Sequence, residues 1–196
     1  AFDPQRFDDI RKDMIRALQN TVASPPASQV MNDLREALLY GEWGEQALIA
    51  ALEQMDMADV EDYARRFWAS ATAEVLIYGN YEKEFAQQVS AMLSTVIPAA
   101  PAPSLPDLRV LQLAAGESLL YEVDVPHDDS VVAWYLQGAA NEWRDRGAAA
   151  LTAQIIKSGF FQQLRTEQQL GYLVSAFAWP QLEVPGLVML IQSPVA

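Results

Sequence analysis

Cysteine is absent from the 196 residues of this chain, and histidine occurs once. The missing thiols exclude disulfide bonds, thiolate metal sites and a cysteine nucleophile, although they do not identify a cellular compartment. A zinc-peptidase motif, direct or inverted, requires at least two histidines, as does a three-histidine zinc site. We therefore expect that one copy of this chain assembles no such zinc site.

The single histidine, His127, lies in the polar stretch Val-Pro-His-Asp-Asp-Ser at 125–130, which is typical of a turn. A Ser-His-Asp triad would have to use this residue. A solvated turn histidine is the simpler interpretation, because turn-forming polar residues surround it. The sequence also contains no glycine-rich phosphate loop and no Gly-x-Ser-x-Gly elbow.

Long apolar runs are missing as well, since no stretch of about eighteen uncharged apolar residues occurs that would span a bilayer. The N-terminus lacks the features of a signal peptide, so a signal of a longer parent would lie elsewhere. Basic residues are scarce and scattered, with 13 Lys and Arg against 26 Asp and Glu and a net charge of −13. This balance argues against nucleic acid or an anionic lipid surface as a partner and favours solubility.

The chain does contain a large apolar fraction, 51%, which suffices for one large core or two modest ones. Four prolines within the nine residues 98–106 exclude a regular helix or a central strand and favour an extended connector. We therefore predict parts of two domains, at 1–97 and 107–196, joined by a Pro-rich linker at 98–106.

Apolar residues at three- and four-residue spacing predict that the segment 1–97 is mainly helical. Asp3-Pro4 and Ser24-Pro25 are typical helix starts, and Gly41 is a typical stop. The period changes at 74–78, where Glu-Val-Leu-Ile-Tyr predicts one short strand. The apolar stripes of the expected helices lie at 7–18, 30–38, 48–55, 60–68 and 85–96.

Beyond the linker, runs rich in Val, Leu, Tyr and Trp predict strands. The first two, at 119–125 and 131–136, flank the polar turn and are expected to form a hairpin. A long helix is expected at 144–169 with Gly171 as its left-handed stop, followed by strands at 172–177 and 186–192. This order indicates an α+β fold, with a mostly antiparallel sheet and helices packed on one face.

The stretch Phe-Phe-Gln-Gln-Leu-Arg-Thr-Glu-Gln-Gln-Leu-Gly-Tyr at 160–172 carries the most specific pattern in the chain. It resembles the Leu-Arg-Thr-x-x-Gln-Leu-Gly-Tyr motif in the C-terminal half of the pitrilysin and insulin-degrading enzyme (insulinase) family of zinc metallopeptidases. The run at 186–193 resembles the strand that follows this motif. The segment 76–80 resembles the end of the family's third domain, which places the Pro-rich linker at the junction with the fourth.

The resemblance implies that this chain is a fragment of a larger enzyme. In the family, four homologous LuxS/MPP-like metallopeptidase domains form two halves that close around a chamber. This chain would span the later part of domain three and the first half of domain four. The inverted zinc motif and the additional Glu ligand lie in domain one, so zinc would belong to the parent and this chain alone is expected to be inactive. Its partners would be peptide substrates and the N-terminal catalytic half.

Arg165 and Tyr172 are the residues to which the resemblance assigns substrate binding and transition-state support. Hydrolysis of a peptide builds negative charge on the carbonyl oxygen, and an O–H donor or a guanidinium fixed nearby stabilises it. The alternative is a purely structural role. An Arg near a helix C-terminus interacts favourably with the helix dipole, and Tyr is a common residue at the start of a strand. We assign no role to 167–169, whose polar side chains are expected to be solvated.

Two other functions remain open at this point. The parent is either active or a family member that has lost its zinc ligands and serves as a binding or processing partner. Alternatively, the chain is an independent peptide-binding scaffold, since peptides add to exposed sheet edges through main-chain hydrogen bonds. Exposed edges also predict self-association of a fragment. The start at Ala1 without Met suggests an excised piece, and bacterial pitrilysin-like relatives would imply a periplasmic location.

Overall fold

The structure is a computed structural model that describes residues 3–73, 75–97, 108–139 and 142–194. It divides into two compact units, one made of Ala1–Asp13 with Ala51–Asp107 and the other of Met14–Ala50 with Leu108–Ala196. Both units are therefore discontinuous in sequence. These units are not the same as the predicted domains at 1–97 and 107–196, which were assigned from a resemblance to the domains of a family. That domain division stays a prediction. The predicted linker at 98–106 lies outside the described residues.

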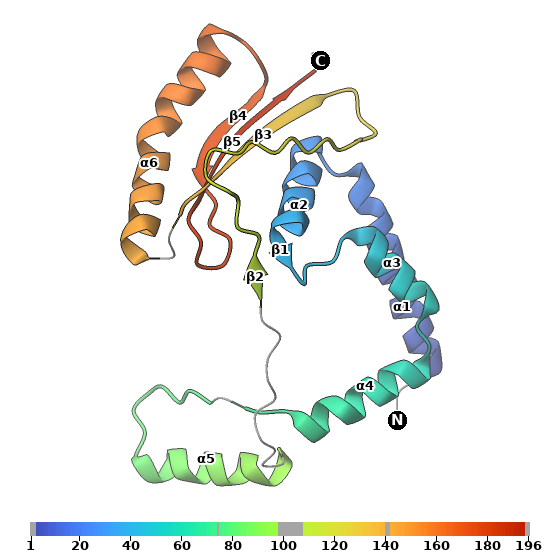
Figure 1. Cartoon of the computed structure of the whole chain (residues 1–196). Coiled ribbons are helices and arrows are strands. Elements are labelled where there is room, and N and C mark those ends of the chain that lie inside the picture. Colours follow the sequence, from blue (N-terminus) through green and yellow to red (C-terminus); the bar gives the residue numbers. More distant parts are fainter. Residues whose placement is uncertain (1–2, 74, 98–107, 140–141, 195–196) are drawn as a thin grey trace. The chain divides into compact units, whose positions relative to one another are not determined.

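The first unit is helical (Figure 1), and α1 and α4 begin at residues whose side chains cap the helix. The chain starts α1 (Pro4–Asn20) with the carboxylate of Asp3, which accepts a hydrogen bond from the backbone N–H of Gln5 at 3.0 Å. Asp56 and Asp59 form a reciprocal capping box at the start of α4 (Met57–Ser70). The unit also contains α5 (Lys83–Val96) and the end of α3 (Glu45–Gln54).

The second unit is built on an antiparallel sheet in the order β3-β5-β4. Its central strand, β5 (Gly186–Ser193), pairs along its whole length with β3 (Ser130–Gln137). On its other side it pairs with β4 (Leu173–Ala178). The α+β class and the antiparallel sheet predicted from the sequence are confirmed.

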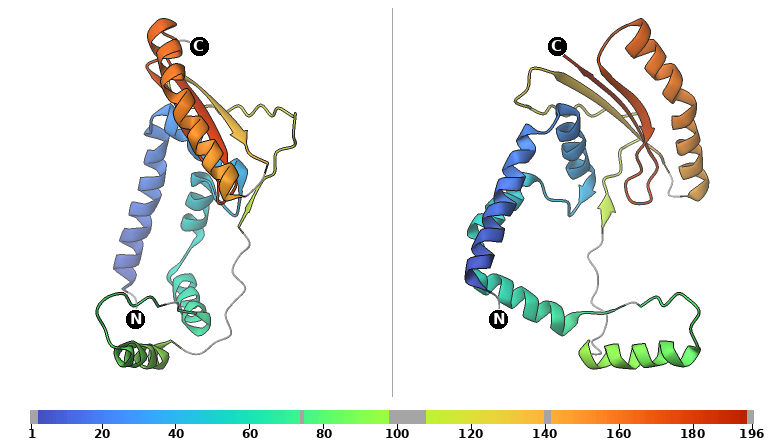
Figure 2. Two further views of the ribbon diagram at one scale, coloured as in Figure 1. Left: turned by 90° about the vertical axis from the view of Figure 1, so that its left-hand side faces the viewer. Right: turned by 180° about the vertical axis from the view of Figure 1, so that it is seen from behind.

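Helices lie against both faces of this sheet, and the views in Figures 1 and 2 agree on their sides. On one face, Ala27 of α2 (Pro26–Leu38) packs with Val188 and Leu190 in the buried core. On the opposite face lies α6 (Trp143–Phe161), where Ala153, Val174 and Ala176 are buried. Within 107–196 the helix thus covers one face, as predicted, while α2 from the N-terminal part of the chain covers the other.

A short second sheet, which the sequence did not predict, lies in the same unit. Its strands are β1 (Leu39–Tyr40) and β2 (Arg109–Val110), which pair antiparallel. The side chain of Gln137 holds the chain that follows, since it accepts from the backbone N–H of Leu113 at 2.8 Å and donates to the carbonyl of Leu111 at 2.9 Å. Strands of two residues are too short to show the alternation of apolar and polar residues from which a strand is predicted.

Two predicted strands are wrong. The described residues of the run at 74–78 form no strand, and Leu76 and Tyr78 are 92% and 94% exposed. The run at 119–125 forms none either, so the predicted hairpin with β3 is also wrong. A strand exists only with a partner, and within the described ranges neither run has one.

The predicted helices are confirmed, but two of their stops are wrong. Gly41, with a φ of +91°, follows β1 instead of ending α2, which stops at Leu38. The long helix continues beyond α6 as a π-helical segment, η2 (Gln162–Glu167). Its left-handed residue is Gln169, with a φ of 55°, and not Gly171.

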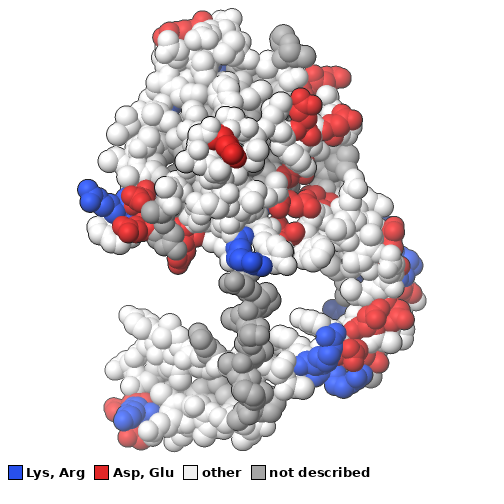
Figure 3. All heavy atoms as spheres, in the orientation of Figure 1, with Lys and Arg blue, Asp and Glu red and all other residues white. Residues whose placement is uncertain are grey.

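The surface in Figure 3 reflects the acidic composition. On the face drawn there, most Lys and Arg atoms border Asp or Glu atoms, and among the described residues no basic stripe is visible. Local ion pairs explain part of this pattern, since Asp62 accepts from both Arg65 and Arg66 at 2.8 Å on α4. Among the described helices, none combines the length and the apolarity needed to cross a bilayer.

Candidate functional site

The segment from η2 to β4 places the two residues that the sequence singled out. The π-helical turn is closed by a hydrogen bond from the N–H of Gln168 to the carbonyl of Gln163 at 3.0 Å. A second bond runs from the N–H of Leu170 to the carbonyl of Leu164 at 2.9 Å. Single π-turns at the end of an α-helix often occur at functional sites, because they re-aim the side chains of that turn. Arg165 lies on this turn.

Gly171 brings the chain against the end of β5. A Cβ atom at this position would lie 2.2 Å from the carbonyl oxygen of Gln192, so any side chain would clash with the backbone. That same carbonyl accepts a hydrogen bond from the N–H of Tyr172 at 3.1 Å. The glycine therefore allows the close approach that fixes the backbone of Tyr172 at the start of β4.

Arg165 and Tyr172 line one open hollow of about 670 Å³. The Arg165 side chain is half-buried, and Tyr172 is 52% exposed, so neither is part of the core. Within the described ranges, no carboxylate lies close enough to Arg165 to form an ion pair. The guanidinium therefore keeps its donors available for a ligand in the hollow. The remaining lining residues are Phe161, Thr166, Gln169, Gly171, Ser193 and Pro194.

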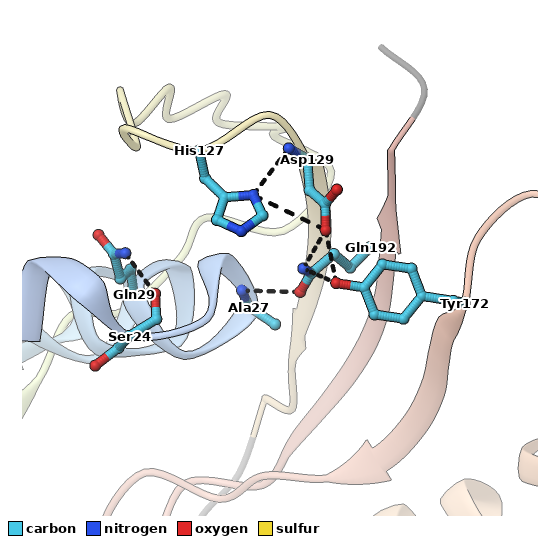
Figure 4. A network of polar contacts seen from close by, with 7 residues as sticks. All are labelled: Ser24, Ala27, Gln29, His127, Asp129, Tyr172 and Gln192. Carbon is cyan, nitrogen blue, oxygen red and sulfur yellow. Dashed lines mark hydrogen bonds and ion pairs between the residues drawn. The ribbon is translucent and has the colours of Figure 1, made fainter.

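The hydroxyl of Tyr172 belongs to a polar network drawn in Figure 4. It donates to Oδ2 of Asp129 at 2.6 Å. The amide Nε2 of Gln192 donates to the same carboxylate oxygen at 2.7 Å and also contacts the tyrosine hydroxyl. On its other side, Oε1 of Gln192 accepts from the backbone N–H of Ala27 at 3.2 Å. The network thus connects the start of β4, the end of β5, the turn before β3 and the first turn of α2.

Histidine 127 closes the turn that carries Asp129. Its Nδ1 accepts a hydrogen bond from the backbone N–H of Asp129 at 2.9 Å, which requires an unprotonated Nδ1. The same nitrogen lies 3.9 Å from Oδ2 of Asp129. The imidazole is exposed, as expected of a turn histidine, and its contact supports the turn.

The network shifts the proton affinities of both acidic groups in it. Hydrogen bonds from the Tyr172 hydroxyl, and then from the Gln192 amide, hold the pKa of the Asp129 carboxyl below its ordinary value. The bond to Asp129 raises the pKa of the Tyr172 phenol, with burial adding to the rise. The favoured arrangement is therefore a neutral phenol donating to an ionised carboxylate.

The structure brings together both residues predicted from the sequence and adds two that were missed. Asp129 stood in a polar turn and gave no signal of its own. Gln192 did give one, because it is a polar residue at an inward position of an otherwise apolar strand and is only 1% exposed. A buried amide of this kind requires hydrogen-bond partners, so its position indicates a polar network inside the fold.

Zinc does not fit the residues that the structure describes. Among the described residues, no group of three or more His, Asp or Glu side chains is placed to hold a metal ion. The His127 and Asp129 side chains are directed into the network above, and the rest of the chain has no other histidine and no cysteine.

Comparisons with known proteins give one consistent set of relatives. A family profile described as "PQQ synthase PqqF-like, C-terminal lobe domain 4" matches residues 151–196. Insulin-degrading enzyme of Drosophila melanogaster is 28% identical over 201 residues, which cover 98% of this chain and 20% of the relative. The human insulin-degrading enzyme is 27% identical over 200 residues, covering 97% of this chain and 19% of the relative.

A more distant relative and a solved structure agree. The A-factor-processing enzyme of Saccharomyces cerevisiae is 25% identical and covers 98% of this chain and 20% of itself. The crystal structure of pitrilysin matches with a TM-score of 0.83 at 19% identity, over 100% of this chain and 21% of that one. At that identity the match shows the fold. The chain spans about a fifth of the length of the relatives it matches.

Proposed function

The homologues of this chain are insulin-degrading enzymes and pitrilysin-like proteins, and we propose that it is a non-catalytic C-terminal portion of a zinc metalloendopeptidase. In this proposal the parent hydrolyses peptides in a closed chamber. This chain contributes part of the chamber wall and two residues that bind substrate, Arg165 and Tyr172. The zinc ligands and the chemistry of the metal belong to the other half.

The observation that carries the proposal is the common hollow lined by Arg165 and Tyr172. The two residues come from different elements, the π-turn of η2 and the start of β4, yet they meet at one open concavity. Arg165 offers guanidinium donors that pair with no carboxylate among the described residues, and Tyr172 offers a hydroxyl at the rim. Charged and hydroxyl donors that converge on a concave surface are typical of a binding site.

Donors of this kind suit the developing charge of peptide hydrolysis. As the carbonyl carbon becomes tetrahedral, negative charge grows on its oxygen, and a fixed hydrogen-bond donor stabilises the transition state more than the ground state. A guanidinium is charged at every relevant pH, and a phenol stays neutral and able to donate up to high pH. Arg165 would therefore orient the peptide and support the oxyanion directly. Tyr172, whose phenolic hydrogen is donated to Asp129 in this structure, would support the oxyanion by turning that hydrogen toward the bound peptide.

The predicted domain division belongs to the same proposal. Residues 1–97 would be the later part of the third domain, and 107–196 the first half of the fourth. The profile named for a fourth C-terminal-lobe domain matches 151–196, which supports the second assignment. The sheet of β3, β5 and β4 with α6 on one face also fits half of an α+β domain of this type.

Substitutions in the longer protein test the proposal. We expect Arg165→Ala and Tyr172→Phe each to lower kcat for a peptide substrate by roughly 10- to 1000-fold, the range for removal of one transition-state donor. Neither residue is in the core, so both variants should stay folded, and Tyr172→Phe should lower the thermal midpoint only modestly because it removes one hydrogen-bond donor from the Asp129 carboxylate. Steady-state kinetics and thermal melting measure the two effects.

Matched controls are available on the same chain. Arg144 lies exposed at the start of α6, and Tyr121 is 67% exposed in the segment before β3. Arg144→Ala and Tyr121→Phe should leave the kinetics unchanged. Unaltered turnover in both Arg165→Ala and Tyr172→Phe, with zinc retained, would refute the proposed role of these residues. It would favour the alternative, in which the longer protein is a binding or processing partner and has no such site.

A further inference from the structure

The phenol of Tyr172 belongs to a set of hydrogen bonds in which the donor and the acceptor of each bond can be assigned. Oε1 of Gln192 must face Ala27, because the backbone N–H there is a donor that requires an acceptor. This fixes Nε2 on the other side, where it donates to Asp129 and contacts the Tyr172 hydroxyl. The phenolic hydrogen is then left for the Asp129 carboxylate, which accepts it at 2.6 Å.

Asp129 is not an ordinary surface carboxylate. Only 12% of its side chain is exposed, and Nδ1 of His127, across the turn, accepts a hydrogen bond from the backbone N–H of Asp129. The carboxylate is stabilised mainly by two neutral donors, the phenol and the amide. A partly buried carboxylate needs such donors, which is a reason for the three side chains to act as a unit.

The elements around this unit hold it in place from several directions. Gln192 ends the central strand β5 and is 1% exposed. Ala27 opens α2, whose first turn is tied further by a hydrogen bond from Nε2 of Gln29 to the carbonyl of Ser24 at 2.7 Å (Figure 4). A side chain fixed through two partners keeps its position, which is what a residue placed to contact a substrate requires.

We propose that Asp129 is a positioning residue for Tyr172: its carboxylate, set by Gln192, accepts the phenolic hydrogen and holds the tyrosine at the rim of the hollow beside Arg165. The inference rests on the proposed function, because the orientation of Tyr172 matters for catalysis only if Tyr172 binds substrate. Asp129 itself lies outside the residues that line the hollow and acts through the tyrosine.

The first experiment measures the contact itself. Tyrosine labelled with ¹³C at Cζ reports each phenol by NMR, and the signal of Tyr172 is the one lost in Tyr172→Phe. In the full chain we expect Asp129→Ala to move this signal and to bring the pKa of the phenol back toward its ordinary value. Asp128→Ala, the matched control at the exposed neighbouring carboxylate, should leave both unchanged. An unmoved Tyr172 signal in Asp129→Ala would refute the positioning.

The second experiment measures the consequence in the longer protein. Asp129→Ala should lower kcat by at least about 10-fold and change KM little, and it should have less than about a 2-fold effect when Tyr172 is already Phe. Asp129→Asn is expected to retain most of the activity, because its Oδ1 accepts the same hydrogen bond. This isosteric variant keeps the test valid if Asp129→Ala folds poorly.

The outcomes separate the two proposals. If Tyr172→Phe is itself harmless, the proposed function of Tyr172 fails, whatever the NMR result. If Tyr172→Phe is harmful but Asp129→Ala loses the same factor in both backgrounds, or loses nothing, the proposed function stands and the positioning by Asp129 is wrong.

Discussion

Gly171 is the residue on which the geometry of the candidate site depends most directly. It has no unusual backbone conformation, and its importance comes from space, because the carbonyl oxygen of Gln192 occupies the place of a side chain. The adjacent N–H of Tyr172 uses the same carbonyl. Any atom inserted there would push β4 from β5 at the point where Tyr172 enters the sheet.

We predict that Gly171→Ala destabilises the protein by about 1–3 kcal/mol, the usual cost of overpacking a tight contact. Gly159 is the matched control, since it lies exposed on α6 and an added Cβ would meet nothing within 4 Å. Gly159→Ala should stabilise by about 0.5–1 kcal/mol, because alanine has the higher helix propensity. Urea unfolding compares them, and equal effects of the two changes would contradict the contact.

At the residue scale, the sequence predicts what is local and misses what is distant. Arg165 and Tyr172 are predicted together because one continuous motif contains both. Asp129 is 43 residues from Tyr172 and 63 from Gln192, so nothing in their spacing indicates a contact. Gly171 is identified as special, but for the wrong reason, since a close approach between strands cannot be distinguished from a helix stop without the fold.

At the element scale, the sheet of the second unit depends on the core that it shares with α2. Val188 is fully buried there, with Leu190 and Ala27 beside it. Val132, on the neighbouring strand β3, is 50% exposed. The same residue type thus occupies two strands of one sheet with opposite burial, which allows a direct comparison of their contributions.

Val188→Ala should cost about 2 kcal/mol or more in the free energy of unfolding, because it removes buried methyl groups and leaves a cavity. Val132→Ala should cost less than about 1 kcal/mol, mainly through lower β propensity. Chemical denaturation of the two variants tests the assignment of the inward face. A greater loss for Val132→Ala would mean that the register of β5 is wrong.

Helices were predicted more reliably than strands for a physical reason. The stripes of α1, α2, α4 and α5 are complete within their own segments, so period alone reveals them. The runs at 74–78 and 119–125 have strand composition, yet β structure requires a partner that composition does not specify. β4 and β5 were predicted correctly, and these two strands follow one another along the chain and pair with each other.

At the scale of the whole molecule, the proposal assigns the metal and the transition-state donors to different parts of one protein. In the proposal this chain supplies donors at an open hollow, and its described residues include no group placed to hold a metal ion. The sequence predicted the same division from the single histidine and the 160–172 motif, and the division stays a prediction. It could not describe the hollow, which requires η2, β4 and the end of β5 to meet in space.

The most direct test of transition-state support is to compare two ligands in the longer protein with and without Tyr172→Phe. A phosphinic peptide imitates the tetrahedral transition state, and the product peptide imitates the ground state. We predict that the change weakens binding of the phosphinic peptide by the same factor, roughly 10- to 1000-fold, by which it lowers kcat/KM, and leaves the product affinity unchanged. Equal weakening of both ligands, or of neither, would contradict the account.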